Sequence, residues 1–73
     1  MKQIGENITL EQQGSTTIIR ISNNLGYDTA DDLRNAYQEV KTSNILVDLG
    51  QVTITTSRGM ATLLSIIVEG QEE

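Results

Sequence analysis

The chain has 73 residues and a formal net charge of −5, and it contains neither cysteine nor histidine. The length allows one domain, residues 1–73, and a chain of this size buries only about 60% of its surface on folding. The composition excludes disulfides, thiolate metal sites and catalysis by a Ser-His or Cys-His pair. Self-association is the remaining way to add stability.

The distribution of charged and aromatic residues argues against nucleic acid as a partner. The five basic residues are scattered, and two tyrosines are the only aromatic residues. Such a chain has no basic stripe for phosphates and no stacking platform for bases. The amino terminus lacks the apolar core of a signal peptide, and the apolar run at 60–68 is too short to cross a bilayer. We therefore expect a cytoplasmic protein without membrane insertion.

The first predicted elements form a β-hairpin. Residues 7–12, NITLEQ, alternate between apolar and polar side chains, as a half-buried strand does. Residues 15–22, STTIIRIS, are rich in β-branched residues and read as a second strand. Gly14 and Ser15 supply the turn between them.

A loop and a helix follow the hairpin. Asp28 or Thr29 is placed to cap the helix, which we expect to stop within residues 42–44. The steps of three and four residues predict one apolar stripe. This stripe consists of Ala30, Leu33, Tyr37 and Val40.

A third strand and a second helix complete the predicted order. Residues 44–49, NILVDL, form the strand, and Gly50 breaks it. The helix between the second and third strands favours a parallel pair with a right-handed crossover. The last helix begins at Ser57 or just after it and ends at Gly70. Its predicted apolar face consists of Met60, Leu63, Leu64, Ile67 and Val68.

The parity of the strand residues indicates how the sheet is covered. Ile19 and Ile21 share one face of their strand, and Ile45, Val47 and Leu49 share one face of theirs. The opposite faces mix apolar and polar residues. The fold class is therefore α/β, in the order β-β-α-β-α, with a mixed sheet covered by helices on one face.

Residues 45–64, ILVDLGQVTITTSRGMATLL, resemble the central segment of STAS domains, the fold of anti-sigma-factor antagonists. That segment has an apolar strand ending in Asp-Leu, a Val and a Thr or Ser, and a Ser-Ser-Gly-Leu sequence that opens a helix. The matching residues are Asp48, Leu49, Val52, Thr53, Ser57, Gly59 and Met60. Upstream, the loop and helix start of these domains match in register at Leu25, Thr29, Ala30 and Leu33.

The resemblance implies a STAS-like regulatory module that acts by protein–protein interaction. The implied partner is an anti-sigma factor or a serine-kinase-like protein, and the implied phosphoacceptor is Ser57. The alternative for Ser57 is a plain helix cap, worth about 1 kcal/mol. The partner-binding residues that we expect are Leu25, Tyr27, Thr55, Thr56, Arg58, Gly59 and Met60, and burial in the core is the alternative for Leu25 and Tyr27.

Four positions depart from the STAS pattern and leave a second function open. Asn23 replaces the turn glycine, Gly26 replaces an acidic residue, Thr56 replaces the Asp before the serine, and Arg58 replaces the second serine. Loss of the acidic positions favours a structural subunit that mediates assembly or transporter regulation without a phospho-switch. We expect no enzyme activity, catalytic residues, metal or cofactor, and the sequence contains no phosphate loop for a nucleotide.

The last expectation concerns self-association. STAS domains continue through further strand–helix units, whereas this chain stops at Glu73. The strand at 44–49 would then lie at an open apolar edge, which invites pairing with another chain. We therefore expect a homodimer or higher oligomer, formed by edge pairing or by exchange of the last helix.

Overall fold

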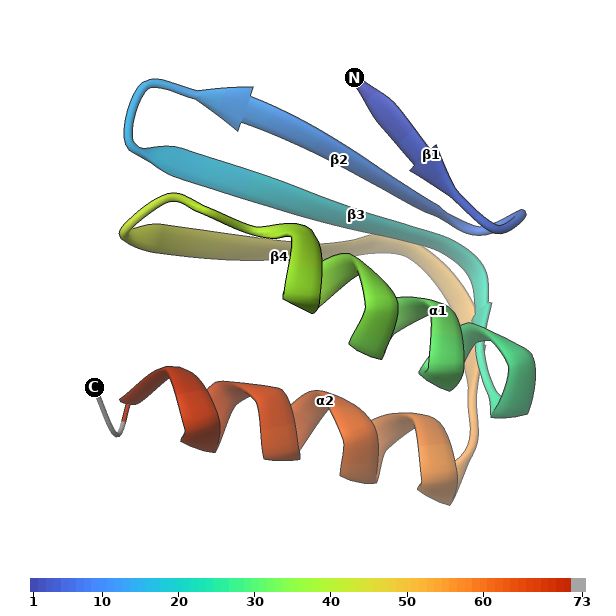
Figure 1. The fold of residues 1–73 in the computed structure, drawn as a ribbon. Helices are drawn as coiled ribbons and strands as arrows, with labels where there is room; N and C mark the ends of the chain where they lie inside the picture. Colours follow the sequence, from blue (N-terminus) through green and yellow to red (C-terminus); the bar gives the residue numbers. More distant parts are fainter. Residues whose placement is uncertain (72–73) are drawn as a thin grey trace.

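The computed structural model describes residues 1–71 and contains a four-strand mixed sheet with two helices (Figure 1). The strands lie in the order β1-β2-β3-β4, and β3 and β4 are parallel whereas the other neighbours are antiparallel. Both helices lie on the same face of the sheet (Figure 1). The elements are β1 (Lys2–Ile4), β2 (Ile8–Gln13), β3 (Thr16–Leu25), α1 (Tyr27–Glu39), β4 (Asn44–Thr55) and α2 (Ser57–Gln71).

The predicted hairpin is confirmed as β2 and β3. Leu10 lies opposite Ile19 and Ile8 lies opposite Ile21, so these side chains share the face that the helices cover. Gly14 in the turn has φ 61°, a left-handed conformation that glycine adopts without steric cost. The alternation of apolar residues therefore fixes the pairing of these two strands.

The strand β1 is absent from the order expected from the sequence. Lys2 lies opposite Leu10 and Ile4 opposite Ile8, so β1 adds an antiparallel strand outside β2. The observed order β-β-β-α-β-α corrects the expected β-β-α-β-α. Three residues of mixed polarity are too few to show a strand period.

The strand β4 continues past Gly50, where the sequence predicts its end. It has 12 residues, and residues 44–48 pair with β3 in regular parallel register. The register shifts between Asp48 and Gln51 and again before Ile54, as bulges require. The N–H of Gly50 donates to the Asp48 carboxylate at 2.9 Å. Gly50 thus belongs to a bulge and does not end the strand.

The helix α1 begins and ends earlier than predicted. Gly26 is its N-cap residue, so neither Asp28 nor Thr29 caps it. It ends at Glu39, before the predicted range of 42–44. Its apolar stripe lies largely as expected, because Leu33 is fully buried.

One hydrophobic core lies between the sheet and the two helices. It unites both strands of the hairpin with one face of each helix. The buried members are Ile8, Leu10, Ile19, Ile21, Leu25, Leu33, Ala36, Leu63 and Ile66. Partly buried side chains pack against them, namely Ile4, Tyr37, Val40, Val47 and Val52.

The buried face of α2 differs from the predicted face. Leu63 and Ile66 are each 3% exposed, and Leu63 alone belongs to the predicted set. The other predicted residues are 37–55% exposed, namely Met60, Leu64, Ile67 and Val68. Apolar residues surround more than one side of α2, so its period does not decide which side is buried. The helix also continues to Gln71, beyond the expected end at Gly70.

Candidate functional site

The carboxyl ends of β3 and β4 and the starts of both helices meet at one end of the sheet (Figure 1). Because β3 and β4 are parallel, their carboxyl ends lie together, and this is where ligands and partners bind in open α/β sheets. Leu25 at the end of β3 pairs with Thr55 at the end of β4. We call residues 55–60 the β4–α2 corner.

Thr56 caps α2. Its hydroxyl accepts a hydrogen bond from the N–H of Gly59 at 3.2 Å, and its carbonyl accepts one from the N–H of Met60 at 3.0 Å. Its own N–H donates to the carbonyl of Leu25 at 3.0 Å. Thr56 therefore fixes the helix start to the end of β3, and Ser57 is not the cap residue.

Ser57 occupies the first helical position of α2 and is exposed. Within residues 1–71 its hydroxyl takes part in no side-chain hydrogen bond, because Thr56 supplies the capping oxygen. The first turn of α2 carries no acidic residue, and Arg58 follows Ser57 directly. The site thus combines a free hydroxyl with the positive end of a helix.

Gly59 lets α2 approach the end of β3 closely. A Cβ atom at this position would lie 2.0 Å from the carbonyl oxygen of Leu25 and 2.9 Å from its Cγ. Both residues are buried, and Leu25 has 0% exposure. Because Gly59 has no side chain, α2 can approach the end of β3 closely, and this approach positions the corner.

Arg58 and Tyr27 link the starts of the two helices. The guanidinium carbon of Arg58 lies 5.0 Å from the centre of the Tyr27 ring, within the range of a cation–π contact. Tyr27 is 70% exposed. The pair forms a surface that joins an aromatic ring and a positive charge next to Ser57.

The structure separates the expected contact residues into surface and core. Tyr27, Thr55, Thr56, Arg58 and Met60 are exposed on or beside the corner. Leu25 and Gly59 are buried: the side chain of Leu25 faces the interior and Gly59 has none, so both residues position the corner without presenting a side chain to a partner. This corrects their assignment as contact residues.

A hydrogen-bonded cluster that the sequence analysis did not identify fixes the start of α1. The hydroxyl of Thr29, which is 1% exposed, donates to Asn24 Oδ1 at 3.0 Å and accepts from Asn7 Nδ2 at 3.3 Å. Asn7 Oδ1 also accepts from Asn23 Nδ2 at 3.1 Å. The Asn23-Asn24 doublet is a signal for this cluster in the sequence. Nothing in the local pattern indicates that Asn7, far away in the chain, is its partner.

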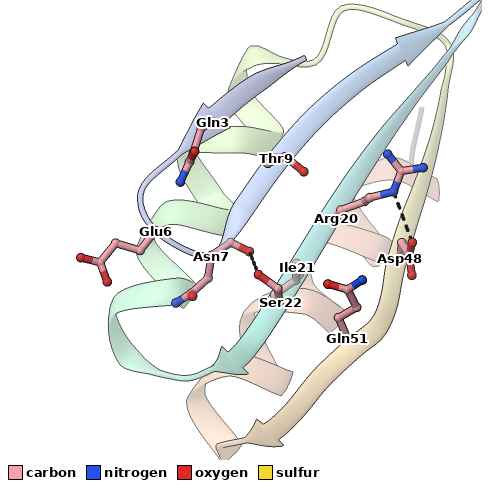
Figure 2. Close-up of a pocket in the computed structure, with 9 residues that line it drawn as sticks. All are labelled: Gln3, Glu6, Asn7, Thr9, Arg20, Ile21, Ser22, Asp48 and Gln51. Atoms are coloured by element: carbon pink, nitrogen blue, oxygen red, sulfur yellow. Dashed lines mark hydrogen bonds and ion pairs between the residues drawn. The ribbon is translucent and has the colours of Figure 1, made fainter.

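The sheet face opposite the helices carries a polar hollow of about 240 Å³ (Figure 2). Arg20 Nε lies 3.4 Å from Asp48 Oδ2 on this face, and Arg20 also pairs with Glu11. A hydrogen bond from Gln13 is the main cause that lowers the pKa of Glu11, and the hydrogen bond and positive charge of Arg20 lower it further. The polar side chains that line the hollow are Gln3, Glu6, Asn7, Thr9, Arg20, Ser22, Asp48 and Gln51.

The hollow is lined by amides, hydroxyls and the carboxylates of Glu6 and Asp48, and its one cation, Arg20, is paired with Asp48. In the part of the chain that the structure describes, His, Cys, Asp and Glu form no group of three that could hold a metal ion. Neither helix of residues 1–71 combines the length and apolar character that a bilayer crossing needs. The β4–α2 corner brings an exposed hydroxyl, a guanidinium and an aromatic ring together at the start of a helix, and we take it as the candidate site.

No protein-family model matches the chain, and no curated protein matches it at a significant level. Its function must therefore be argued from its own residues.

Proposed function

We propose that the chain is a STAS-like regulatory module that presents the β4–α2 corner to a protein partner and is switched by phosphorylation of Ser57. The implied partner is an anti-sigma factor or a serine-kinase-like protein. One observation carries the proposal: Thr56 takes the capping role, so the exposed Ser57 hydroxyl is free. A kinase can modify such a hydroxyl without removing a structural hydrogen bond.

A phosphoryl group suits the position of Ser57. Thr56 already accepts the N–H of Gly59, but the N–H groups of Ser57 and Arg58 have no intrahelical partner, and these groups and the positive end of the helix dipole attract an anion. Arg58 can make a charge-assisted hydrogen bond to it. The group adds about −1.5 to −2 charges to the contact surface. Phosphorylation would therefore preserve the fold and change partner binding.

Two backbone features support the STAS-like assignment. Asn23 stands at the position of the family's turn glycine, and its φ of 66° lies in the left-handed region that glycine favours. Gly59 stands at the position of the Ser-Ser-Gly glycine, and the space beside it admits no Cβ atom. Both positions have the backbone constraint that a glycine pattern implies.

The test compares Ser57 with a matched serine outside the corner. Ser43 is exposed in the turn before β4, so S43A and S43D serve as controls for S57A and S57D. Calorimetric titration with a serine-kinase-like partner should show binding weakened about tenfold or more, at least 1.4 kcal/mol, for S57D alone. Mass spectrometry after incubation with the kinase and ATP should find phosphate on wild type and none on S57A. Equal affinity for both Ser57 variants, with native circular dichroism, would refute the switch.

A second candidate function is a structural subunit that mediates assembly or transporter regulation without a switch. The replacement of the family's acidic residues by Gly26 and Thr56 favours it, because the kinase-docking surface loses negative charge. The exposed apolar residues of α2 also favour a permanent contact. This function predicts a stable complex that neither nucleotide nor phosphorylation of Ser57 changes.

A further inference from the structure

The outer side of β4 exposes apolar side chains along an unpaired strand. Leu46 is 55% exposed, Leu49 39% and Ile45 36%. Within residues 1–71, β4 is the last strand of the sheet, so its outer backbone groups have no strand partner there. Residues 44–48, which precede the first bulge, include no lysine or proline, the residues that commonly protect such edges, and Asp48 is their one charged residue. This strand is therefore a template for another strand.

One hydrogen bond establishes which residues of β4 direct their backbone groups outward. The N–H of Asn44 donates to the carbonyl of Ser15 at 3.1 Å, so Asn44 bonds toward β3. Successive residues of a strand direct their N–H and C=O groups to opposite sides. Ile45 and Val47 therefore direct these groups away from β3, and Leu46 directs its groups toward β3.

The side chains of the same residues alternate between the two faces of the sheet. The contact between Arg20 and Asp48 lies on the face opposite the helices (Figure 2). Leu46 is two residues before Asp48, so it shares that face. Ile45 and Val47 point to the helix face, where Val47 packs against the core.

We propose that β4 pairs with β4 of a second copy of this chain, in antiparallel orientation, about a twofold axis at Leu46. The two Leu46 side chains then contact each other on the open face, and Ile45 lies opposite Val47 of the other copy on the helix face. Asn44 lies opposite Asp48 of the other copy, where an amide donor meets a carboxylate acceptor. This inference goes beyond the proposed function and does not depend on it.

Two neighbouring registers are less complementary. An axis at Val47 places the apolar Leu46 opposite the charged Asp48 of the other copy. An axis at Asp48 places two carboxylates opposite each other, which is destabilising. The regular part of β4, residues 44–48, is centred on Leu46, and the bulge at Gly50 ends it. The backbone and the side chains therefore favour the same axis.

The helix α2 extends the proposed interface beneath the joined sheets. Arg34 on α1 contacts Glu69 at 2.9 Å and Ser65 at 3.2 Å, so that side of α2 faces α1. A different side faces the core through Leu63 and Ile66. The helical steps place three exposed apolar residues on a third side, away from α1, namely Met60, Leu64 and Ile67. In the pair, this uncharged side of α2 faces α2 of the other copy.

Sedimentation velocity of three forms of the chain tests the proposal. Wild type should sediment as a dimer at micromolar concentration. Leu46→Lys should raise the dissociation constant at least about 100-fold and give monomer. Ile54→Lys is the matched control and should remain dimeric, because Ile54 is 64% exposed on the same strand but lies past both bulges. A monomeric wild type overturns the proposal, as does a dimer that L46K leaves intact, which would indicate exchange of α2.

Cysteine crosslinking tests the register itself. The chain has no cysteine, so Leu46→Cys introduces a single thiol. The two Leu46 positions form a non-hydrogen-bonded antiparallel pair, with Cα atoms about 4.5 Å apart, within reach of a disulfide. Mild oxidation should convert L46C to a covalent dimer and leave Ile54→Cys largely monomeric. Equal crosslinking of the two variants overturns the assigned register.

Discussion

The carbonyl oxygen of Leu25 lies 2.0 Å from the point where a Cβ atom of Gly59 would stand. The end of β3 and the first turn of α2 thus approach each other closely at two buried residues, Leu25 and Gly59. Together with the Thr56 cap, this contact determines where Ser57 and Arg58 are displayed. The geometry of the candidate site therefore depends on a residue without a side chain.

Gly59→Ala should destabilise the fold by about 1–3 kcal/mol, because the methyl group forces backbone to shift in a packed region. In an unconstrained helix the same change stabilises by up to about 1 kcal/mol, so the sign is informative. Urea unfolding measures the free energy. Gly50→Ala is the control, because its Cβ would meet only the Asp48 carboxylate, at 3.2 Å, and that side chain can move. A stabilised G59A variant would contradict the close approach.

Thr56→Ala should cost about 1 kcal/mol of stability, as loss of a helix cap does. Ser57→Ala should change the free energy of unfolding by less than about 0.5 kcal/mol, since an exposed side chain without partners is removed. Thermal or urea unfolding of the two variants under identical conditions distinguishes them. The reverse order of costs would show that Ser57, not Thr56, caps α2.

Thr29→Val should destabilise the fold by about 1–3 kcal/mol. The substitution keeps the shape of the side chain but removes the hydroxyl that joins Asn24 and Asn7. Thr29→Ser is the control, because it keeps the hydroxyl and loses only a methyl group. If Val is tolerated better than Ser, packing rather than hydrogen bonding decides this position.

The pKa of Glu11 should rise in Gln13→Ala, because the side-chain amide of Gln13 donates to the Glu11 carboxylate at 2.6 Å and is the main cause that lowers this pKa. A carboxyl group with a lowered pKa in the folded state stabilises the fold above its unfolded-state pKa. That stability is lost as the pH falls through the lower, folded-state value. The Q13A variant should therefore lose less stability on acidification.

An NMR titration of the Glu11 carboxyl carbon measures the shift. Gln12→Ala is the matched control, because the Gln12 amide donates to the carbonyl of Gly14 instead. Arg20 remains in both variants, so part of the lowering should persist in each. An unchanged Glu11 pKa in Q13A would exclude the hydrogen bond as its cause.

The sequence predicts the elements whose periods are long and unambiguous. The alternation through Ile8, Leu10, Ile19 and Ile21 predicts the hairpin, and the stripe through Leu33 predicts α1. The strand β1 has too few residues to show a period. In the sequence, Gly50 indicates the end of a strand. It belongs to a bulge instead, and a bulge depends on pairing with the neighbouring strand, which the local sequence does not reveal.

The candidate site could be predicted as a position but not in its details. The hydroxyl cluster before Gly59 indicates the start of a helix, yet Thr56 and Ser57 are both good cap residues. Only the hydrogen bonds to Gly59 and Leu25 assign the cap to Thr56. The buried side of α2 was unpredictable for a related reason, since several sides are apolar and tertiary neighbours select one.

The two edge strands of the sheet, β1 and β4, differ, and this difference limits how far association can proceed. On the far side, β1 offers three residues, and Lys2 there is held by an ion pair with Glu39. The edge strand β1 is short and charged, so it pairs poorly with a further strand. A molecule with a single edge strand available for pairing cannot associate further once that strand is paired. Raising the concentration should thus yield discrete pairs and not fibres.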